Sequence, residues 1–381
     1  MSIPAQRLAT VQEYYFSKKL REVGQRIAAG QEIINMGIGS PDLAPPEGVV
    51  AALQAGFSHP KAHQYQSYQG LPELREAIAH FYHSHFKVTL NPNTQVLPLM
   101  GSKEGIMHLS MAFLNPGDQV LLPNPGYPTY AAVTKLVEAE AIHYPLTAAT
   151  NWQPDMNYLE ALDTSKIKLM WLNYPHMPTG TKAQAGLFKS LVDWAKRNEV
   201  LLINDNPYSF ILNDAPQSIL HTPGALDTAI EFNSLSKTFN MAGWRVGMAL
   251  GHERFITALL KVKSNMDSGM FYGIQKGAVA ALHAKAHWFT QLNTTYANRK
   301  KVLLQLIEKL GLSTAADQVG LFLWAKLPEG AASAEEYIDT LLDEKHIFIA
   351  PGTIFGSEGE GYVRFSLCVD EATIEKALAR L

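Results

Sequence analysis

Between about residues 45 and 250 the chain alternates short apolar runs with loops and helical segments. The runs predicted to be strands are residues 95–100, 119–122, 169–172, 201–203, 229–232 and 246–250. Helices between strands return the chain so that the next strand runs in the same direction, and such helices cover both faces of the sheet. The alternation therefore predicts an α/β fold whose large domain has a mostly parallel, mixed sheet sandwiched by helices.

The alternation stops near residue 265, and the rest of the chain predicts a smaller α+β domain. A long connecting helix is predicted over about 273–310, and after it a strand at 320–326, a helix at 334–344, strands at 347–350 and 362–367, and a helix at 371–381. An amphipathic helix over 13–29 and a short strand at 33–36 precede the large domain. We expect residues 1–44 to join 271–381 in the small domain, with 45–270 as the large domain.

The composition argues against several classes of protein. The chain has 381 residues, of which 47% are hydrophobic and 18% charged, as is typical of a globular protein with a large core. A net charge of −3 gives no reason to expect nucleic acid or an anionic membrane as a partner. No apolar run approaches the roughly 20 residues that cross a bilayer. The single cysteine, Cys368, leaves no disulfide framework. We expect a reduced, cytoplasmic protein.

The strand at 229–232 leads into Ser234-Leu235-Ser236-Lys237, and Arg245 follows eight residues after the lysine. Burying a lysine and an arginine among apolar residues is costly unless the charges are paired or used. A buried amine loses its proton readily and can form a Schiff base with a carbonyl, while hydroxyls and a guanidinium suit a phosphate. The stretch indicates an aldehyde-bearing phosphate cofactor, for which pyridoxal phosphate (PLP) is the obvious candidate.

Other predicted strands end in residues that suit the same cofactor, and open α/β sheets bind ligands at the carboxyl ends of their strands. These residues are, in chain order, Ser102 and Lys103, Tyr127, Asp205 and Tyr208. The first pair opens a helix whose backbone N–H groups can hold a phosphate, and the first tyrosine can stack on a ring. The aspartate offers a carboxylate to a pyridine nitrogen, and the second tyrosine offers a phenol to the ring hydroxyl. Their joint appearance predicts a PLP site.

Three stretches resemble the fold type I PLP enzymes and, within them, the class I/II aminotransferases. They are Ser-Leu-Ser-Lys-Thr-Phe-Asn-Met-Ala-Gly-Trp-Arg at 234–245, Gly-Ser-Lys-Glu-Gly at 101–105 and Pro-Gly-Tyr-Pro at 125–128. The resemblance runs from about residue 33 to the C-terminus and is greatest to the LL-diaminopimelate and alanine-type branches. It implies a ping-pong transfer of an amino group from an L-amino acid to a 2-oxo acid through pyridoxamine phosphate, by a homodimer with shared active sites.

The resemblance also implies roles for single residues. Lys237 is expected to hold the cofactor and to move the proton at the substrate Cα, with Asp205 on the pyridine nitrogen and Tyr208 on the ring oxygen. The other cofactor-binding residues are expected to be Ser102, Lys103, Tyr127, Asn173, Ser234, Ser236, Arg245 and, across the dimer interface, Tyr65. Arg364 is expected to clamp the substrate carboxylate through two parallel hydrogen bonds, with the backbone at Gly39 closing over it.

One position departs from the pattern of the family. Its members usually have asparagine before Pro-Thr-Gly, where it bonds the ring oxygen and the substrate carboxylate, and this chain has Met177. A thioether donates no hydrogen bond. We expect either that His176 or Asn173 takes over, or that Arg364 holds the carboxylate with less help.

Several residues also have a plainer interpretation. Asp205 alone could cap a turn, Tyr127 could be a loop aromatic, and Arg364 could pair with a buried acid. Tyr68 competes with Tyr65 for the role at the dimer interface. A metal site at His80, His83 and His85 is disfavoured against a solvated helix face, because no carboxylate or cysteine lies near them. No metal is therefore expected.

Two rival functions remain beside the aminotransferase. A PLP-dependent C–S lyase would share the scaffold and the deprotonation at Cα, and the departure at Met177 keeps it open. A non-enzymatic ligand sensor is disfavoured, since no basic stretch or DNA-binding segment accompanies the site. The amino donor stays open: the loop at 265–275 carries no cation for a second carboxylate, whereas the diaminopimelate resemblance favours a second amino-acid head.

Overall fold

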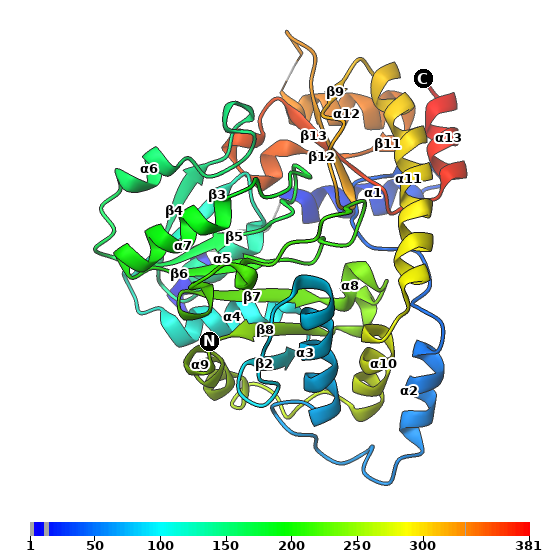
Figure 1. Ribbon diagram of the computed structural model, residues 1–381. Helices are drawn as coiled ribbons and strands as arrows, with labels where there is room; N and C mark the ends of the chain where they lie inside the picture. Colours follow the sequence, from blue (N-terminus) through cyan, green and yellow to red (C-terminus); the bar gives the residue numbers. More distant parts are fainter. Residues whose placement is uncertain (1–3, 11–14, 332) are drawn as a thin grey trace.

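The computed structural model describes residues 4–10, 15–331 and 333–381. Its main element is a seven-stranded sheet of order β2-β8-β7-β6-β5-β3-β4 (Figure 1). β8 is antiparallel to both of its neighbours, and the other adjacent pairs are parallel. The predicted mostly parallel, mixed sheet is confirmed. The strands are β2 (Val96–Leu99), β3 (Gln119–Asn124), β4 (Glu140–Pro145), β5 (Ile167–Leu172), β6 (Leu201–Asp205), β7 (Ala229–Ser234) and β8 (Gly247–Gly251).

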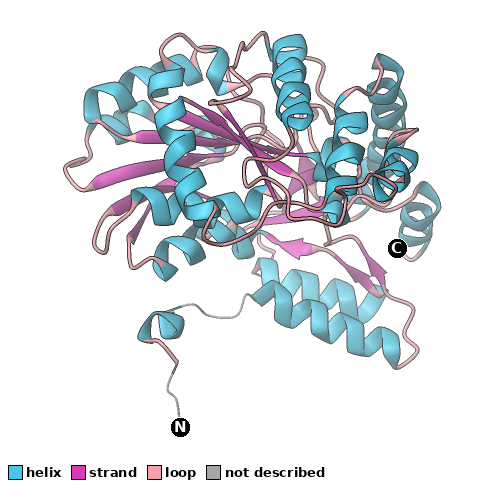
Figure 2. Cartoon of the chain, turned by 90° about the horizontal axis from the view of Figure 1, so that it is seen from below, coloured by secondary structure: helices cyan, strands magenta, loops and turns pink. Residues whose placement is uncertain are grey.

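Both faces of this sheet are buried. In β3, Leu121 packs in one apolar cluster while Val120 and Leu122 pack in another, because successive side chains point to opposite faces. Figure 2 shows the strands as a layer with helices on both sides. One face is covered by α4 (Ser102–Phe113), α5 (Pro128–Leu136) and α9 (Glu253–Lys263). The other carries α3 (Pro72–Phe86), α7 (Leu187–Asn198) and α10 (Tyr272–Leu282).

A second α+β unit is built from both ends of the chain. β1 pairs in parallel with β11, and β12, β13, β10 and β9 form a four-stranded sheet in that order. Phe16 of α1 lies against Phe348 of β11, with ring centroids 6.0 Å apart. The strands are β1 (Ile34–Asn35), β9 (Ser313–Thr314), β10 (Phe322–Lys326), β11 (Ile347–Phe348), β12 (Ala350–Pro351) and β13 (Tyr362–Ser366). The helices are α1 (Tyr15–Ala28), α11 (Ala286–Lys309), α12 (Ala334–Lys345) and α13 (Glu371–Ala379). The domain limits at 44 and 270 stay a prediction.

Three sequence predictions were wrong in detail. The helix over 273–310 is two helices, α10 and α11, because the chain turns at 283–285, where the His283 ring hydrogen-bonds the last turn of α10 at Val279 O. The strand at 347–350 is β11 and β12, which belong to different sheets. β4 was not predicted, since this edge strand is only partly buried and its sequence lacks a continuous apolar run. The start of the helix predicted from residue 13 lies outside the described residues.

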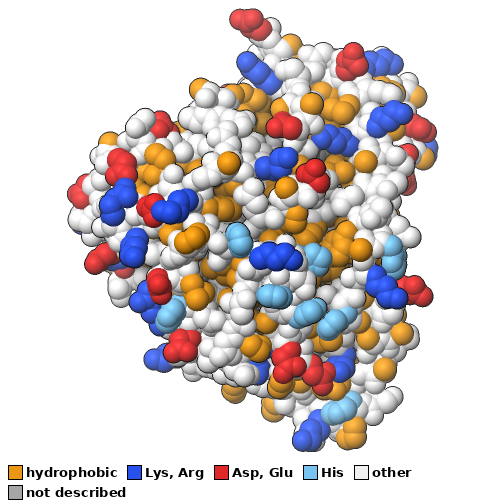
Figure 3. Space-filling view, in the orientation of Figure 1, with side chains coloured by type: hydrophobic (Ala, Val, Ile, Leu, Met, Phe, Trp, Pro, Cys, Tyr) orange, Lys and Arg blue, Asp and Glu red, His pale blue; other side chains and the backbone are white. Residues whose placement is uncertain are grey.

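Three shorter helices complete the fold: α2 (Val49–Phe57), α6 (Met156–Glu160) and α8 (Leu235–Thr238). Within the described ranges no helix combines the length and the apolar character needed to cross a membrane. Acidic and basic side chains are interspersed over the face drawn in Figure 3. The visible surface thus carries no broad field of a single charge.

Two glycines allow a test of how α2 packs on α10. A Cβ added at Gly56 of α2 would lie 2.7 Å from Gly273 Cα, so Gly56→Ala pushes backbone against backbone. We expect this change to lower the free energy of unfolding by about 1–3 kcal/mol. Gly24→Ala is the matched control: Gly24 lies in α1 with nothing within 4 Å of the added Cβ, so it should gain up to about 1 kcal/mol of helix propensity. Chemical denaturation measures both, and equal stability of the two variants would contradict the close contact.

Candidate active site

A cavity of about 680 Å³ opens at the carboxyl edge of the large sheet. Every site residue proposed from the sequence lines it, except Tyr65. The residues so placed are Gly39, Ser102, Lys103, Tyr127, Asn173, Asp205, Tyr208, Ser234, Ser236, Lys237, Arg245 and Arg364. The structure therefore brings together residues that lie up to 325 positions apart in the chain, as Gly39 and Arg364 do (364 − 39).

The strand directions explain this convergence. β2, β3, β5, β6 and β7 run in one direction, so the residues after each strand emerge at one edge. Arg245 precedes β8, which runs the opposite way, and it therefore enters the sheet at the same edge. Because β8 is antiparallel, Arg245, which precedes it, lies beside the residues that follow the parallel strands.

Asp205 carries a buried carboxylate with one oxygen free. Oδ2 accepts a hydrogen bond from the Tyr130 hydroxyl at 2.9 Å, and Oδ1 has no partner within the described part of the chain. Burial raises the pKa of Asp205 to about 6. Tyr130 was not predicted as a site residue. It stands three residues after Tyr127, about one helical turn, and this spacing indicates that the two side chains lie on the same side of α5. An unpaired buried oxygen is suited to a cationic N–H such as a protonated pyridine.

Lys237 lies on the short helix α8, directly after β7. Its Nζ donates a hydrogen bond to Gly39 O at 2.7 Å. Burial is the main cause that lowers the pKa of its amine, and the positive charges of Arg364 and Arg245 lower the pKa further. A lysine in such surroundings supplies the neutral amine that attacks a carbonyl.

A phosphate-sized cradle is formed where β2 meets α4. Gly101 has a positive φ of 91° just before α4, and a Cβ there would overlap the guanidinium of Arg245. A Cβ at Gly247 would lie 2.5 Å from the Ser102 backbone nitrogen. The two glycines let Arg245 approach the free N–H groups at the start of α4, an arrangement suited to a dianion.

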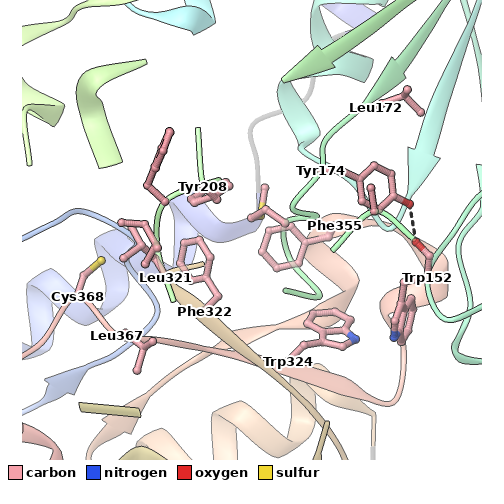
Figure 4. Close-up of a cluster of buried hydrophobic side chains, with 14 of the residues drawn as sticks. Trp152, Leu172, Tyr174, Tyr208, Leu321, Phe322, Trp324, Phe355, Leu367 and Cys368 are labelled. Atoms are coloured by element: carbon pink, nitrogen blue, oxygen red, sulfur yellow. Dashed lines mark hydrogen bonds between the residues drawn. The ribbon is translucent and has the colours of Figure 1, made fainter. Parts of the chain in front are cut away.

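Arg364 projects from β13 and is buried. Its Cζ lies 3.9 Å from the ring centroid of Phe322 and 4.7 Å from that of Phe355. Figure 4 shows these two rings close to each other in the apolar cluster beside Tyr208. Burial lowers the pKa of Arg364 to about 10, and within the described residues no carboxylate pairs with it. The alternative of a buried acid partner is therefore not supported, and the guanidinium suits a ligand carboxylate.

The two substitutes considered for the missing asparagine are both engaged elsewhere. The amide of Asn173 donates to Asp205 O at 2.5 Å and accepts from Met177 N at 2.9 Å. His176 shares a hydrogen bond with Thr179 Oγ1 at 2.8 Å, and burial lowers its pKa to about 3. Met177 itself lines the cavity, with Sδ 3.4 Å from Arg364 Nη1. His176 does not line the cavity, so its taking over is not supported, whereas the alternatives with Asn173 and with Arg364 alone stay predictions.

Tyr65 does not reach the cavity of its own chain. Its side chain is 91% exposed and that of Tyr68 is 45% exposed. Neither residue lines the cavity. A contribution of either to a cofactor site requires a second subunit.

Sequence reasoning missed one wall of the cavity. This wall consists of Tyr15, Phe16 and Ser17 of α1 with Thr353 and Ile354 of the turn after β12. No local motif marks these residues, because they reach the cavity only when the two ends of the chain pack together.

One group of possible metal ligands lies within the described ranges. Glu104, His108 and Asp267 bring ligand atoms within 4.8 Å of one another. Lys263 Nζ is 2.7 Å from both Asp267 oxygens, so an ammonium already neutralises this carboxylate. His80, His83 and His85 are not part of such a group.

The residues in the cavity fit PLP. The amine of Lys237 suits its aldehyde, the free oxygen of Asp205 its pyridinium, and the cradle at Gly101 and Arg245 its phosphate. The three features come from separate strand ends and face one cavity.

The raised pKa of Asp205 predicts a pH-dependent stability of the cofactor-free protein. A carboxyl whose folded pKa is about 6, against 3.8 for the free group, destabilises the fold increasingly as pH rises through this window, and the cost then stays constant. Asp205→Asn removes the cost. We expect its advantage in unfolding free energy over the wild type to widen by about 1 kcal/mol from pH 5 to pH 8. Denaturation at both pH values measures it, with the exposed Asp214→Asn as control; an advantage that shrinks as pH rises would contradict the buried carboxylate.

Comparison with known proteins agrees with the geometry. The family model for aminotransferase class I and II matches residues 31–381. The LL-diaminopimelate aminotransferase of Dehalococcoides mccartyi (strain 195) is 40% identical over 379 residues, covering 99% of this chain and 97% of the relative. That of Aquifex aeolicus is 41% identical over 377 residues, covering 98% and 97%. The structure of substrate-bound BacF from Bacillus subtilis superposes with a TM-score of 0.95 at 34% identity, covering 100% of this chain and 97% of that one. The chain belongs to the class I and II aminotransferases and is a PLP-dependent aminotransferase of fold type I.

Proposed function

We propose that the cavity is the transamination site of this enzyme, with the roles expected from the sequence. Lys237 holds and releases the cofactor, Asp205 bonds the pyridine nitrogen and Tyr208 the ring oxygen. Phosphate is bound by Ser102, the backbone at Lys103, Ser234, Ser236 and Arg245, while Tyr127 stacks on the ring and Asn173 borders it. The observation that carries the proposal is the free, buried Oδ1 of Asp205 in the same cavity as the amine of Lys237, whose pKa burial lowers.

The chemistry follows from these positions. When bound, the cofactor draws the electrons of the substrate Cα–H bond into its protonated ring. Asp205 keeps the ring nitrogen protonated, Lys237 Nζ moves the proton at Cα, and Arg364 fixes the substrate carboxylate. The C–S lyase alternative is not favoured, since the relatives are aminotransferases.

For the amino donor we propose an amino acid with a second amino group, of the LL-diaminopimelate kind named for the relatives. The buried hydroxyl of Tyr15 has no hydrogen-bond partner in the described residues, and Asp339 helps burial to raise its pKa to about 12. Thr353 Oγ1 donates to Glu335 at 3.0 Å. The distal head of LL-diaminopimelate carries both an ammonium and a carboxylate. Glu335 behind the Thr353 hydroxyl suits the ammonium, whereas Lys19, whose Nζ lies 2.7 Å from Asp339, balances the second carboxylate and leaves the Tyr15 hydroxyl to donate to the distal carboxylate.

A spectroscopic panel tests this donor. We expect LL-diaminopimelate to convert the visible band of the holoenzyme to that of the amino form of the cofactor, and a 2-oxo acid to restore it. Tyr15→Phe should raise KM for the diamino donor about threefold to tenfold and leave KM for alanine unchanged. Lys237→Ala is the blank and should show no conversion. Conversion by alanine alone would contradict the diamino donor, and release of pyruvate and ammonia without a 2-oxo acid would favour the lyase.

We also propose a homodimer in which Tyr65 reaches the phosphate of the neighbouring subunit. Tyr65 is 91% exposed and does not line the cavity of its own chain, which supports this role.

We further propose that residues 1–44 and 271–381 form a small domain and that the enzyme is cytoplasmic. The one cysteine is buried and unpaired, as suits a reducing compartment.

Subunit mixing tests the shared site. Lys237→Ala lacks activity, and Tyr65→Phe should bind PLP about tenfold more weakly, because it lacks one hydrogen bond to a charged phosphate. In a mixed dimer one site combines Lys237 of one subunit with Tyr65 of the other, so mixing should restore activity with wild-type PLP affinity. Activity that keeps the weak affinity after mixing would show that Tyr65 acts within its own chain or not at all.

A further inference from the structure

The guanidinium of Arg364 is tightly enclosed and still has donors to spare. Nη2 donates to Gly37 O at 2.8 Å, and Nε is buried without a partner in the described part of the chain. Phe322 and Phe355 lie against the guanidinium, whose Cζ is 3.9 and 4.7 Å from their ring centroids. The stacked rings fix its plane, so that a ligand carboxylate meets the edge of the group. Unless a neighbouring side chain adds a hydrogen-bond donor, no other side chain helps this edge to bind the carboxylate.

The neighbour at this edge is a thioether. Met177 Sδ lies 3.4 Å from Arg364 Nη1, and the Met177 side chain is buried and lines the cavity. Sulfur in a thioether is a weak acceptor and donates nothing. The Asn173 amide accepts from Met177 N and spends one of its two N–H donors on Asp205 O. His176 does not line the cavity. The space beside Nη1 is thus occupied by a group unable to bond a carboxylate.

We propose that Met177 is a substrate-binding residue that limits how tightly this aminotransferase holds the carboxylate of its substrates. The inference rests on the role proposed above for Arg364. The thioether keeps hydrogen-bond donors out of the space beside the guanidinium, so the fork of Arg364 binds the carboxylate without a neighbouring side-chain amide, while the backbone at Gly39 closes over it. The amino donor and the 2-oxo acid acceptor both carry this carboxylate. Met177 therefore weakens the binding of both substrates.

The experiment measures the binding of propionate, which has a carboxylate but no amine, to the PLP-loaded dimer. Met177→Asn supplies an amide donor beside Arg364, and we expect it to bind propionate about fivefold to tenfold more tightly than the wild type. Met177→Gln, which keeps the length of the methionine side chain, is the second donor variant in case Met177→Asn does not fold. Met177→Leu is the matched control, since it is apolar, of similar volume and without a donor, and should stay within about twofold of the wild type.

Steady-state kinetics give a second readout. An added contact made equally to substrate and transition state lowers KM and leaves kcat unchanged. We expect Met177→Asn to lower KM for both the amino donor and the 2-oxo acid by a similar factor. A variant that only disturbs packing raises KM or lowers kcat, so a gain in affinity is not a result of structural damage.

Two outcomes would overturn the proposal. If both donor variants bind propionate no more tightly than the wild type, Met177 does not limit carboxylate binding. If Met177→Leu binds propionate about fivefold more weakly than the wild type, the sulfur atom itself favours carboxylate binding, and Met177 does more than exclude a donor. Arg364→Ala separates this inference from the proposed function. If Arg364→Ala binds propionate as tightly as the wild type, the proposed role of Arg364 as the carboxylate clamp is refuted. If Arg364→Ala weakens propionate binding but the Met177 variants do not change it, only the inference about Met177 is refuted.

Discussion

Five parallel strands that end at one edge of one sheet are the constraint on which this enzyme depends. A parallel strand delivers its following loop to the same edge as its neighbours, whatever the distance along the chain. β8 adds to this edge by running the opposite way, which places Arg245 next to Gly101. Glycine is then required at position 101, because its positive φ is unfavourable for other residues and any Cβ there would occupy the space of the guanidinium.

Desolvation sets the chemistry of the cavity. Burial raises the pKa of Asp205 and lowers those of Lys237 and Arg364, so each group is driven toward its neutral form. Asp205 and Arg364 also keep buried polar atoms without a partner in the described chain. Such groups are costly to a folded protein and persist where a ligand completes them. A pyridinium for Asp205 and a carboxylate for Arg364 are the partners proposed above, and both are groups of a PLP-bound amino acid.

Carboxylate recognition depends on how this pocket differs from the family pattern. Arg364 is held between two phenylalanine rings with Met177 at its edge. A stacked guanidinium in an apolar setting binds an anion strongly, because little water competes for its donors. In the arrangement proposed above, the thioether adds no donor to this fork, and the ion pair with Arg364 contributes most of the binding of the substrate carboxylate.

The sequence by itself determined the fold class and the cofactor, and it named residues that the fold brings into one cavity. Strand periodicity locates the strand ends, and Lys237, Asp205 and Tyr208 are recognisable there because their chemistry is local to single loops. The tertiary structure alone decided the wall of the cavity at Tyr15 and Thr353, which meet only when the two ends of the chain pack together. It likewise decided where the Asn173 amide bonds, since its oxygen and one of its N–H groups are engaged by groups that the sheet brings beside it. The pattern that identifies a strand is visible in adjacent residues of the sequence, whereas a contact between distant segments depends on the packing of the whole chain.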